Sequence, residues 1–181
     1  LVPFNFNLTG ENAIRYAIEI SKVVKLDLVV FHATETNSTS EEKSAQLKRD
    51  VDAIVTQLNE ENAVQISTHI AVGDYEEQIE KYADKHDIRA ILVGTRKVNG
   101  IDKILMEGRT ARFLNGVTLP IFIVPEDYTY KPIEKILWAS DFNPIKNDDA
   151  LDPVVNLAKF YDAEVRIAHV KTSSSDHGNA L

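Results

Sequence analysis

The residues best suited to chemistry lie between two apolar runs in the middle of the chain. The segment from Ile91 to Glu126 holds four of the seven glycines, which are Gly94, Gly100, Gly108 and Gly116. Glycine is needed where the backbone turns through positive φ or comes close to a ligand. A glycine-bearing loop between a buried strand and a helix is also where α/β proteins bind phosphates, on free backbone N–H groups. The segment therefore indicates a candidate phosphate site.

Basic side chains accompany these glycines. Positions 96 to 112 contain two acids, Asp102 and Glu107. They also contain five basic residues: Arg96, Lys97, Lys103, Arg109 and Arg112. The local excess of positive charge lies on a chain whose net charge is −8. An anion site and a solvated basic face of a loop and helix are both consistent with this pattern.

The glycine spacing resembles the signature of the universal stress protein family, which is Gly-x-x-Gly, nine residues, then Gly-Ser or Gly-Thr. Gly94, Thr95 and Gly100 match this pattern. Lys97 stands at the second glycine of the signature, and Glu107 with Gly108 at its closing pair. A slip of one residue would place the closing pair at Gly108 and Arg109. The frame of the signature is kept, but its phosphate-facing positions are altered.

The resemblance implies a degenerate nucleotide site at the following positions: Pro3, Asn5, Ala33, Gly94, Thr95, Lys97, Gly100, Gly108 and Arg109. Asn5 stands where the family usually has an aspartate that contacts the adenosine part of the nucleotide. An amide offers one acceptor and one donor, where a carboxylate accepts two bonds from a ribose. Asn5 is thus either a weakened ribose contact or an amide making a local turn bond. Glu107, near a helix N-terminus, could occupy the N–H groups in place of phosphate.

Composition excludes several classes of function. The chain has no cysteine, which rules out disulfides, thiolate metal sites and cysteine nucleophiles. The acidic balance argues against a nucleic-acid or anionic-membrane partner, and no apolar run reaches membrane-spanning length. The five histidines show no metal-ligand or catalytic spacing, and no nucleophile motif is present. We expect a cytoplasmic protein with no bound metal and no committed catalysis.

Apolar runs and helical patterns alternate strictly along the first part of the chain. Strands are predicted at 1–6, 28–33, 64–71, 90–93 and 119–124, and helices at 9–24, 41–58, 75–85 and 102–114. Such alternation predicts an α/β fold with a parallel sheet and helices on both faces. The resemblance implies an open five-stranded sheet of order 3-2-1-4-5, of the Rossmann-like kind found in adenine nucleotide alpha hydrolases.

The opening of the chain is repeated near its end. Leu1-Val-Pro-Phe-Asn-Phe-Asn aligns with Leu137-Trp-Ala-Ser-Asp-Phe-Asn, and with one inserted residue 13–33 then aligns with 150–170. The repeat predicts a first domain at 1–125, a linker at 126–133, a partial second copy at 134–172 built as strand, helix and strand, and a flexible tail at 173–181. Asp141 of the second copy keeps the carboxylate that the family has at the position of Asn5.

These patterns favour a universal-stress-type binding or regulatory protein. One alternative is a genuine ATP-binding stress protein with Mg²⁺ and slow hydrolysis, in which Lys97 and Arg109 replace backbone contacts. Another is an unrelated flavodoxin-like or electron-transfer-flavoprotein-like domain that shares only the architecture. In the family's strand order the apolar strand from Leu119 to Val124 lies at the sheet edge, and an exposed edge invites pairing. A homo-oligomer through this strand is therefore expected.

Overall fold

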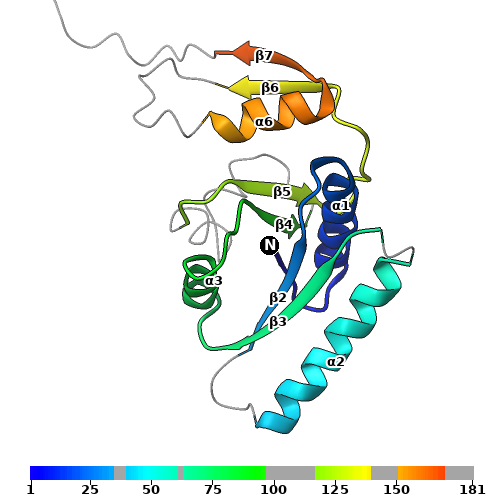
Figure 1. Cartoon of the computed structure of the whole chain (residues 1–181), viewed down its shortest axis with the longest axis vertical. Coiled ribbons are helices and arrows are strands. Elements are labelled where there is room, and N and C mark those ends of the chain that lie inside the picture. Colours follow the sequence, from blue (N-terminus) through cyan, green and yellow to red (C-terminus); the bar gives the residue numbers. More distant parts are fainter. Residues whose placement is uncertain (35–39, 61–62, 97–116, 140–150, 170–181) are drawn as a thin grey trace, which may run out of the picture. The chain divides into compact units, whose positions relative to one another are not determined.

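The computed structural model describes residues 1–34, 40–60, 63–96, 117–139 and 151–169. The chain divides into two compact units, Leu1–Tyr130 and Lys131–Leu181, and each is taken by itself (Figure 1). No helix in these ranges is long and apolar enough to cross a membrane.

The first unit alternates strands and helices. Its strands are β1 (Val2–Pro3), β2 (Leu28–Thr34), β3 (Ile66–Val72), β4 (Ile91–Thr95) and β5 (Ile121–Pro125). Its helices are α1 (Leu8–Val24), α2 (Glu41–Leu58) and α3 (Tyr75–Ala83). All described strand pairs of this unit are parallel. The α/β class with parallel strands and interleaved helices is confirmed, whereas the helix predicted at 102–114 lies outside the described residues.

The five strands do not form one continuous sheet. β1, β2 and β3 make a three-stranded sheet in that order, and β4 and β5 make a separate pair. Among the described residues, Leu1 makes the backbone hydrogen bonds between the two groups: its amino group donates to Ala90 O at 2.8 Å, and Leu92 N donates to Leu1 O at 2.9 Å. β1 is two residues long rather than the six predicted. With β1 this short, and with Pro3 lacking an N–H, the two bonds of Leu1 are the backbone bonds found between β1 and the β4 side in the described residues.

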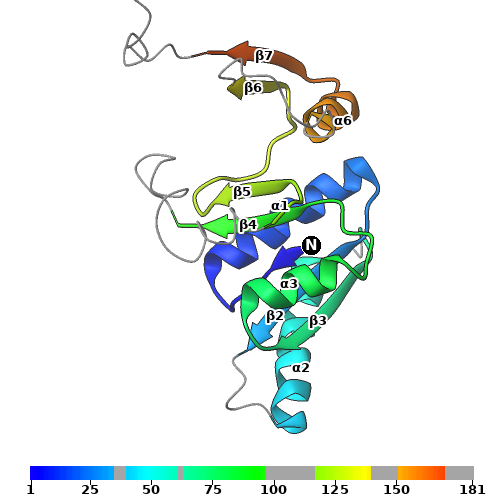
Figure 2. The same ribbon diagram turned by 90° about the vertical axis from the view of Figure 1, so that its left-hand side faces the viewer.

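Buried side chains fill both faces of these strands. Helices α1 and α2 lie on one side and α3 on the other (Figure 2). The cluster beneath α1 and α2 includes Ile14, Val51, Val30 and Leu92. The cluster beneath α3 includes Ile79, Phe31 and Ile91. Neighbouring strand residues go to opposite clusters because successive side chains in a strand point to opposite faces.

Helix α1 begins and ends at residues suited to helix termini. The Asn7 side chain accepts a bond from the Gly10 N–H at 2.8 Å, which satisfies one of the unpaired donors of the first turn. At the other end Lys25 takes the left-handed conformation, and its N–H donates to Ser21 O at 2.9 Å. The helix was predicted to open at Thr9, so the cap lies two residues earlier.

The segment after β5 packs onto α1. The Asn12 side chain donates to Pro125 O at 2.9 Å and to Tyr128 O at 3.1 Å. The ring of Tyr16 lies 5.3 Å from the ring of Tyr130 and 6.0 Å from that of Tyr128. These contacts attach residues 125–130, most of which the sequence assigned to a linker, to the first helix of the unit.

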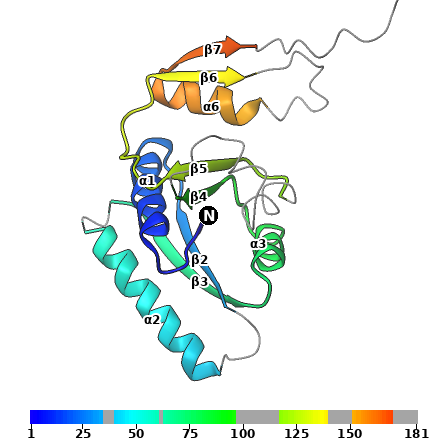
Figure 3. The same cartoon turned by 180° about the vertical axis from the view of Figure 1, so that it is seen from behind.

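The second unit is a strand, a helix and a strand. β6 (Lys135–Ala139) pairs in parallel with β7 (Glu164–Ala168), and α6 (Asp152–Tyr161) connects them and packs on β6 (Figure 3). This is the element order that the sequence repeat predicts. No residue of α6 is buried. The predicted tail and Asp141 lie outside the described residues.

Candidate functional site

The candidate site lies where β1, β2 and β4 end. Open parallel sheets bind ligands beyond the carboxyl ends of their strands, where main-chain groups and loop residues are free to face a ligand. Pro3 ends β1 and is in register with Phe31 of β2, one residue before His32 and two before Ala33. Gly94 and Thr95 end β4. The structure therefore places the described members of the predicted site at three strand ends.

Gly94 lies against the first turn of α1. A Cβ atom at this position would be 2.0 Å from Thr9 O and 3.2 Å from Gly10 N. Both neighbours are backbone atoms, so no side-chain rotation could relieve the overlap. Glycine at this position therefore has a packing reason, the crossing of α1 over β4. The sequence had indicated close approach of a ligand at Gly94, and that interpretation stays a prediction.

Thr95 carries a buried hydroxyl without a partner. The residue is 8% exposed, and among the described residues its Oγ1 makes no hydrogen bond. Its carbonyl accepts from Glu126 N at 2.9 Å, so the main chain is paired. A buried hydroxyl left unpaired costs about 1–3 kcal/mol. Thr95 is thus a polar group at a strand end that a ligand atom could satisfy.

The loop after β1 is held in an unusual conformation. Phe6 has φ of 49°, in the left-handed region that residues other than glycine rarely adopt. Its ring lies 5.0 Å from the ring of His32, edge to face, and 5.1 Å from the ring of Phe4. Buried His32 makes a 2.8 Å hydrogen bond from Nδ1 to Phe4 O. A carbonyl can only accept, so Nδ1 carries the hydrogen of this bond. His32 thereby fixes the loop that presents Asn5.

Asn5 is exposed at the start of this loop. Its side chain has no hydrogen bond within the described parts of the chain, so the local turn bond considered for it is not found there. Asn7 makes the local bond instead, as the cap of α1. Among the described residues, the Asn5 amide is thus exposed and makes no hydrogen bond. Sequence inspection missed Asn7 and the role of His32, although an Asn three residues before a helical Gly is a usable cap signal.

The remaining predicted positions lie outside the described residues. This applies to Lys97, Gly100, Glu107, Gly108, Arg109 and Asp141. The altered part of the signature and the basic excess therefore stay sequence predictions. Of that basic group, Arg96 is described, and it is exposed directly after β4. Among the described residues, no group of three or more His, Asp or Glu side chains could hold a metal ion.

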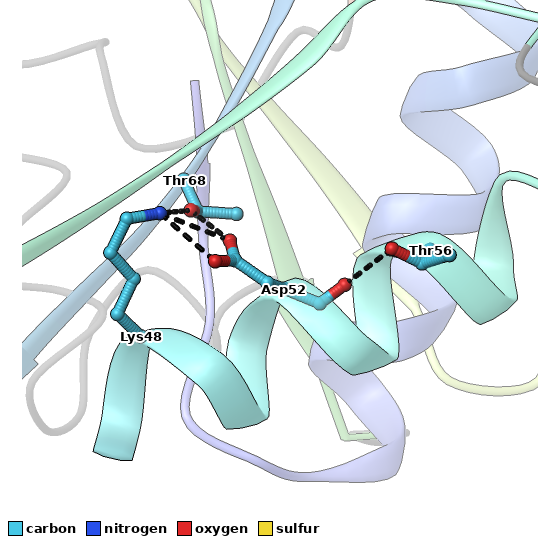
Figure 4. Close-up of polar contacts among 4 residues, drawn as sticks. All are labelled: Lys48, Asp52, Thr56 and Thr68. Carbon is cyan, nitrogen blue, oxygen red and sulfur yellow. Dashed lines mark hydrogen bonds and ion pairs between the residues drawn. The ribbon is translucent and has the colours of Figure 1, made fainter. Parts of the chain in front are cut away.

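A second polar cluster joins α2 to β3 (Figure 4). Lys48 Nζ lies 3.0 Å from Asp52 Oδ2 and 2.7 Å from Thr68 Oγ1, and the Thr68 hydroxyl also donates to the Asp52 carboxylate. Partial burial raises the pKa of Asp52, but the hydrogen bonds from Thr68 and Lys48 and the charge of Lys48 outweigh it and hold the pKa below its usual value. A carboxylate so stabilised in its ionised form is a poor proton donor or acceptor near neutral pH. The cluster attaches the helix to the strand.

Solved structures share the fold of this chain. Universal stress protein UspA from Lactobacillus plantarum is 17% identical, with a TM-score of 0.54, and the match covers 68% of this chain and 94% of that one. A universal stress protein from Archaeoglobus fulgidus DSM 4304 is 18% identical, with a TM-score of 0.74 over 96% of this chain and 67% of that one. A universal stress protein solved in complex with cAMP is 18% identical, with a TM-score of 0.50 over 68% of this chain and 93% of that one. No curated protein sequence matches the chain.

The family assignment comes from the sequence itself. The profile of the universal stress protein family matches residues 1–125, which include every described strand and helix of the first unit. The match spans both the strand-end residues and the glycine-bearing segment that carries the signature. The alternative of an unrelated flavodoxin-like domain does not hold, because the chain belongs to the universal stress protein family.

Proposed function

We propose that this chain is a cytoplasmic binding or regulatory protein of the universal stress type, with a degenerate nucleotide site and no committed catalysis. The observation that carries the proposal is the exposure of the Asn5 side chain and its lack of a hydrogen bond among the described residues. Its amide is exposed beyond β1 and has no hydrogen bond among the described residues. A site built around an aspartate would have a carboxylate there to accept both ribose hydroxyls. The amide offers one acceptor, so at least one such bond is lost.

The altered signature also supports weak nucleotide binding. By the resemblance, Lys97 stands where the family has a glycine that lets backbone approach phosphate, and Glu107 stands where a small residue would open the phosphate-binding turn. Losing one hydrogen bond to a charged partner costs about 1.5–3 kcal/mol, and each 1.4 kcal/mol is about tenfold in affinity. Two such losses move a micromolar site towards millimolar.

The competing function is a genuine ATP-binding protein with Mg²⁺ and slow hydrolysis. Three observations favour it. The Thr95 hydroxyl is buried without a partner among the described residues, and a ligand oxygen would satisfy it. The basic residues Lys97 and Arg109 offer charges to a phosphate. A relative of similar fold has been solved with the nucleotide cAMP, which supports nucleotide binding by the fold.

The same proposal includes an assembly. We propose that β1 joins the two sheets of the first unit into one sheet of order 3-2-1-4-5, supported by the bonds of Leu1 to both sides of Ile91. We propose further that residues 134–172 are a partial second copy of the first domain, supported by the repeated strand-helix-strand order. β5, which overlaps the strand predicted from Leu119 to Val124, pairs with β4 alone among the described strands. Its free edge supports a homo-oligomer through this strand.

Isothermal titration with ATP and Mg²⁺ tests the degenerate site. We expect no binding tighter than about 100 μM. The combined variant Asn5→Asp, Lys97→Gly, Glu107→Gly and Gly108→Ser restores the family pattern and should bind measurably. Asn156→Asp is the matched control, because it makes the same amide-to-carboxylate change at an exposed position of α6. Low micromolar binding by the unaltered chain would establish the competing function instead.

A further inference from the structure

Strand β3 of the first unit has one main-chain edge without a partner in the described structure. It pairs with β2 alone. Leu28 N donates to Gln65 O, and Gly73 N donates to Thr34 O, both at 2.9 Å, so residues 65 and 73 face β2. The side to which N–H and C=O point alternates along a strand. The main-chain groups of the even-numbered residues therefore face the open edge: Ile66, Thr68, Ile70 and Val72.

This edge carries none of the usual features that discourage pairing. β3 lies between α2 and α3 in the first unit, so the edge belongs to the interior of the chain and to neither of its ends. The strand has seven residues, ISTHIAV, and none of them is Pro, Gly, Lys, Arg, Asp or Glu. It runs in unbroken register with β2 from Ile66 to Val72. Native proteins usually protect an edge strand with charges, a proline or a bulge.

The polar cluster of α2 lies over this edge (Figure 4). Val51 and Val55 of the same helix are buried in the core. Lys48 and Asp52 instead reach Thr68 of β3, with Lys48 Nζ 2.7 Å from Thr68 Oγ1. Their side chains stay 52% and 45% exposed, so both can still contact another molecule. One base and one acid therefore flank Thr68 on the edge side of the helix.

We propose that β3 pairs antiparallel with β3 of a second copy of this chain, about a twofold axis at Thr68. Thr68 then lies opposite Thr68 of the other copy, and this central pair exchanges both main-chain hydrogen bonds. Ile66 lies opposite Ile70 of the other copy and exchanges bonds in the same way. The interface is isologous, as expected for a homodimer.

The side chains of both faces agree with this register. On the face covered by α2, threonine meets threonine and isoleucine meets isoleucine, and such matched cross-strand pairs stabilise a sheet. On the other face, Ser67 lies opposite His69 of the other copy in a pair without main-chain bonds. Opposed Cα atoms of such a pair are about 4.5 Å apart, and their side chains are closest. A hydroxyl and an imidazole can hydrogen-bond there.

The charges on α2 favour a second copy as the partner. In the joined sheet the two α2 helices lie antiparallel on the same face. The axis passes between Lys48 and Asp52, because both of them contact the side chain of Thr68. Lys48 of each copy therefore faces Asp52 of the other, and the four charges alternate in sign. A strand of another protein would need its own acid and base at the same level, which a second copy supplies.

The neighbouring register is less favourable. Moving the axis to His69 displaces the copies by two residues, or about 7 Å. Two imidazole rings then lie opposite each other, and the hydroxyl of Thr68 lies opposite the apolar side chain of Ile70. Each Lys48 also moves away from Asp52 of the other copy. The axis at Thr68 is therefore the one that satisfies backbone, side chains and charges together.

The test separates this interface from the one proposed at β5. With both edges in use, copies would join into assemblies larger than a dimer, so the test starts from a chain blocked at β5. Ile91 N donates to Pro120 O at 2.9 Å, so Ile123 directs its N–H away from β4 and Ile123→Pro removes a donor from the outer edge of β5 alone. In this background, light scattering at micromolar concentration should give twice the chain mass of 20.3 kDa. A mass of 20.3 kDa would overturn the proposal.

Charge reversal at the axis should weaken this dimer. In the Ile123→Pro background, Lys48→Glu leaves only acids at the axis and Asp52→Lys leaves only bases. Each variant should raise the dimer dissociation constant about tenfold or more. Mixing the two variants restores opposite charges between copies, so the dimer should return as a heterodimer. The mixture is decisive, because each chain still carries like charges within itself. If the mixture stays monomeric, the proposal is wrong.

A matched control excludes a general effect of charge. Lys81 and Glu77 of α3 form another exposed ion pair between residues four positions apart. Lys81→Glu in the Ile123→Pro background should therefore leave the mass unchanged. An equal loss of dimer with Lys81→Glu would show that net charge and not the β3 edge controls assembly. Circular dichroism checks that every variant is folded.

Discussion

Residues 1–34 and 135–168 have the same element order but very different burial. Each is a strand, a helix and a strand, with the two strands parallel. In the first region seven residues of α1 are buried and Val2, Val30 and Phe31 are inaccessible to solvent. In the second region no residue of α6 is buried and the first four residues of β7 are exposed. The two regions therefore share the order of their elements, but only the first has a core of buried side chains.

The difference comes from the neighbours of each helix. α1 packs on β1, β2, β4, β5 and α2, so its apolar stripe is covered from several sides. α6 packs on β6, and the described part of its unit offers no second helix. A two-stranded sheet with one helix buries too little apolar surface to offset the entropy of ordering its chain. A strand-helix-strand segment of this length is therefore stabilised mainly by the elements that pack around it.

The largest expected effect is a loss of packing in the first region. Phe4 is fully buried in the cluster beneath α1, and Phe160 of α6 is 54% exposed. Phe4→Ala should cost about 4 kcal/mol of unfolding free energy, and Phe160→Ala less than about 0.5 kcal/mol. Urea unfolding followed by circular dichroism measures both. Equal effects of the two substitutions would remove the contrast between the regions.

A smaller effect is expected at the helix starts. Asn7 caps α1 through its side chain, whereas Leu151 precedes α6 in helical conformation with no side-chain cap. Asn7→Ala should therefore cost about 1 kcal/mol, and Leu151→Ala less than about 0.5 kcal/mol. The only tryptophan, Trp138, lies in the second region, so its fluorescence follows that unit separately. A loss of less than about 0.3 kcal/mol for Asn7→Ala would show that the cap contributes little.

Periodicity was enough to predict most elements. The strand at 28–33 and the helix at 41–58 appear as β2 and α2 with nearly the same limits. Their patterns are strong because a buried strand is continuously apolar and an amphipathic helix repeats every three to four residues. β1 was predicted too long. Phe4 N still bonds Phe31 O, but Phe6 then turns through positive φ and ends the strand. An apolar run does not reveal that turn.

The site was less accessible to sequence reasoning. The family resemblance pointed to Asn5, and the glycine spacing pointed to Gly94. For Gly94 the sequence indicated close approach of a ligand, which stays a prediction, and the structure adds a packing reason in the crossing helix. The bond from His32 to the Phe4 carbonyl joins residues 28 positions apart, and the unpaired Thr95 hydroxyl depends on burial. Contacts of this kind are set by the tertiary fold. No local pattern of residue types specifies them.

A column of rings on the first unit has no described counterpart in the second. His69 of β3 stacks on Phe31 at 5.2 Å and contacts Tyr82 of α3 at 4.6 Å, and Tyr82 stacks on His86 at 3.9 Å. The His86 Nδ1 bonds Tyr82 O at 2.8 Å. The column attaches α3 to the sheet. Burial lowers the pKa of His69, and the positive charges of His86 and Lys48 lower it further.

The lowered pKa of His69 makes the unfolding free energy depend on pH. Because the folded pKa of His69 lies below its unfolded value of about 6.5, the unfolded chain binds more protons around that pH. The contribution to stability is therefore complete above about pH 6.5 and is lost as the pH falls through the folded pKa. We expect the unfolding free energy of the unaltered chain to fall more steeply between pH 7.5 and pH 5.5 than that of His69→Gln or His69→Phe. Both replacements are uncharged, so both should flatten the profile equally although they differ in packing. Urea unfolding at the two pH values measures this small difference. If the three profiles are parallel, His69 binds protons equally in the folded and unfolded chain. Its charge then has no effect on the stability of the ring column.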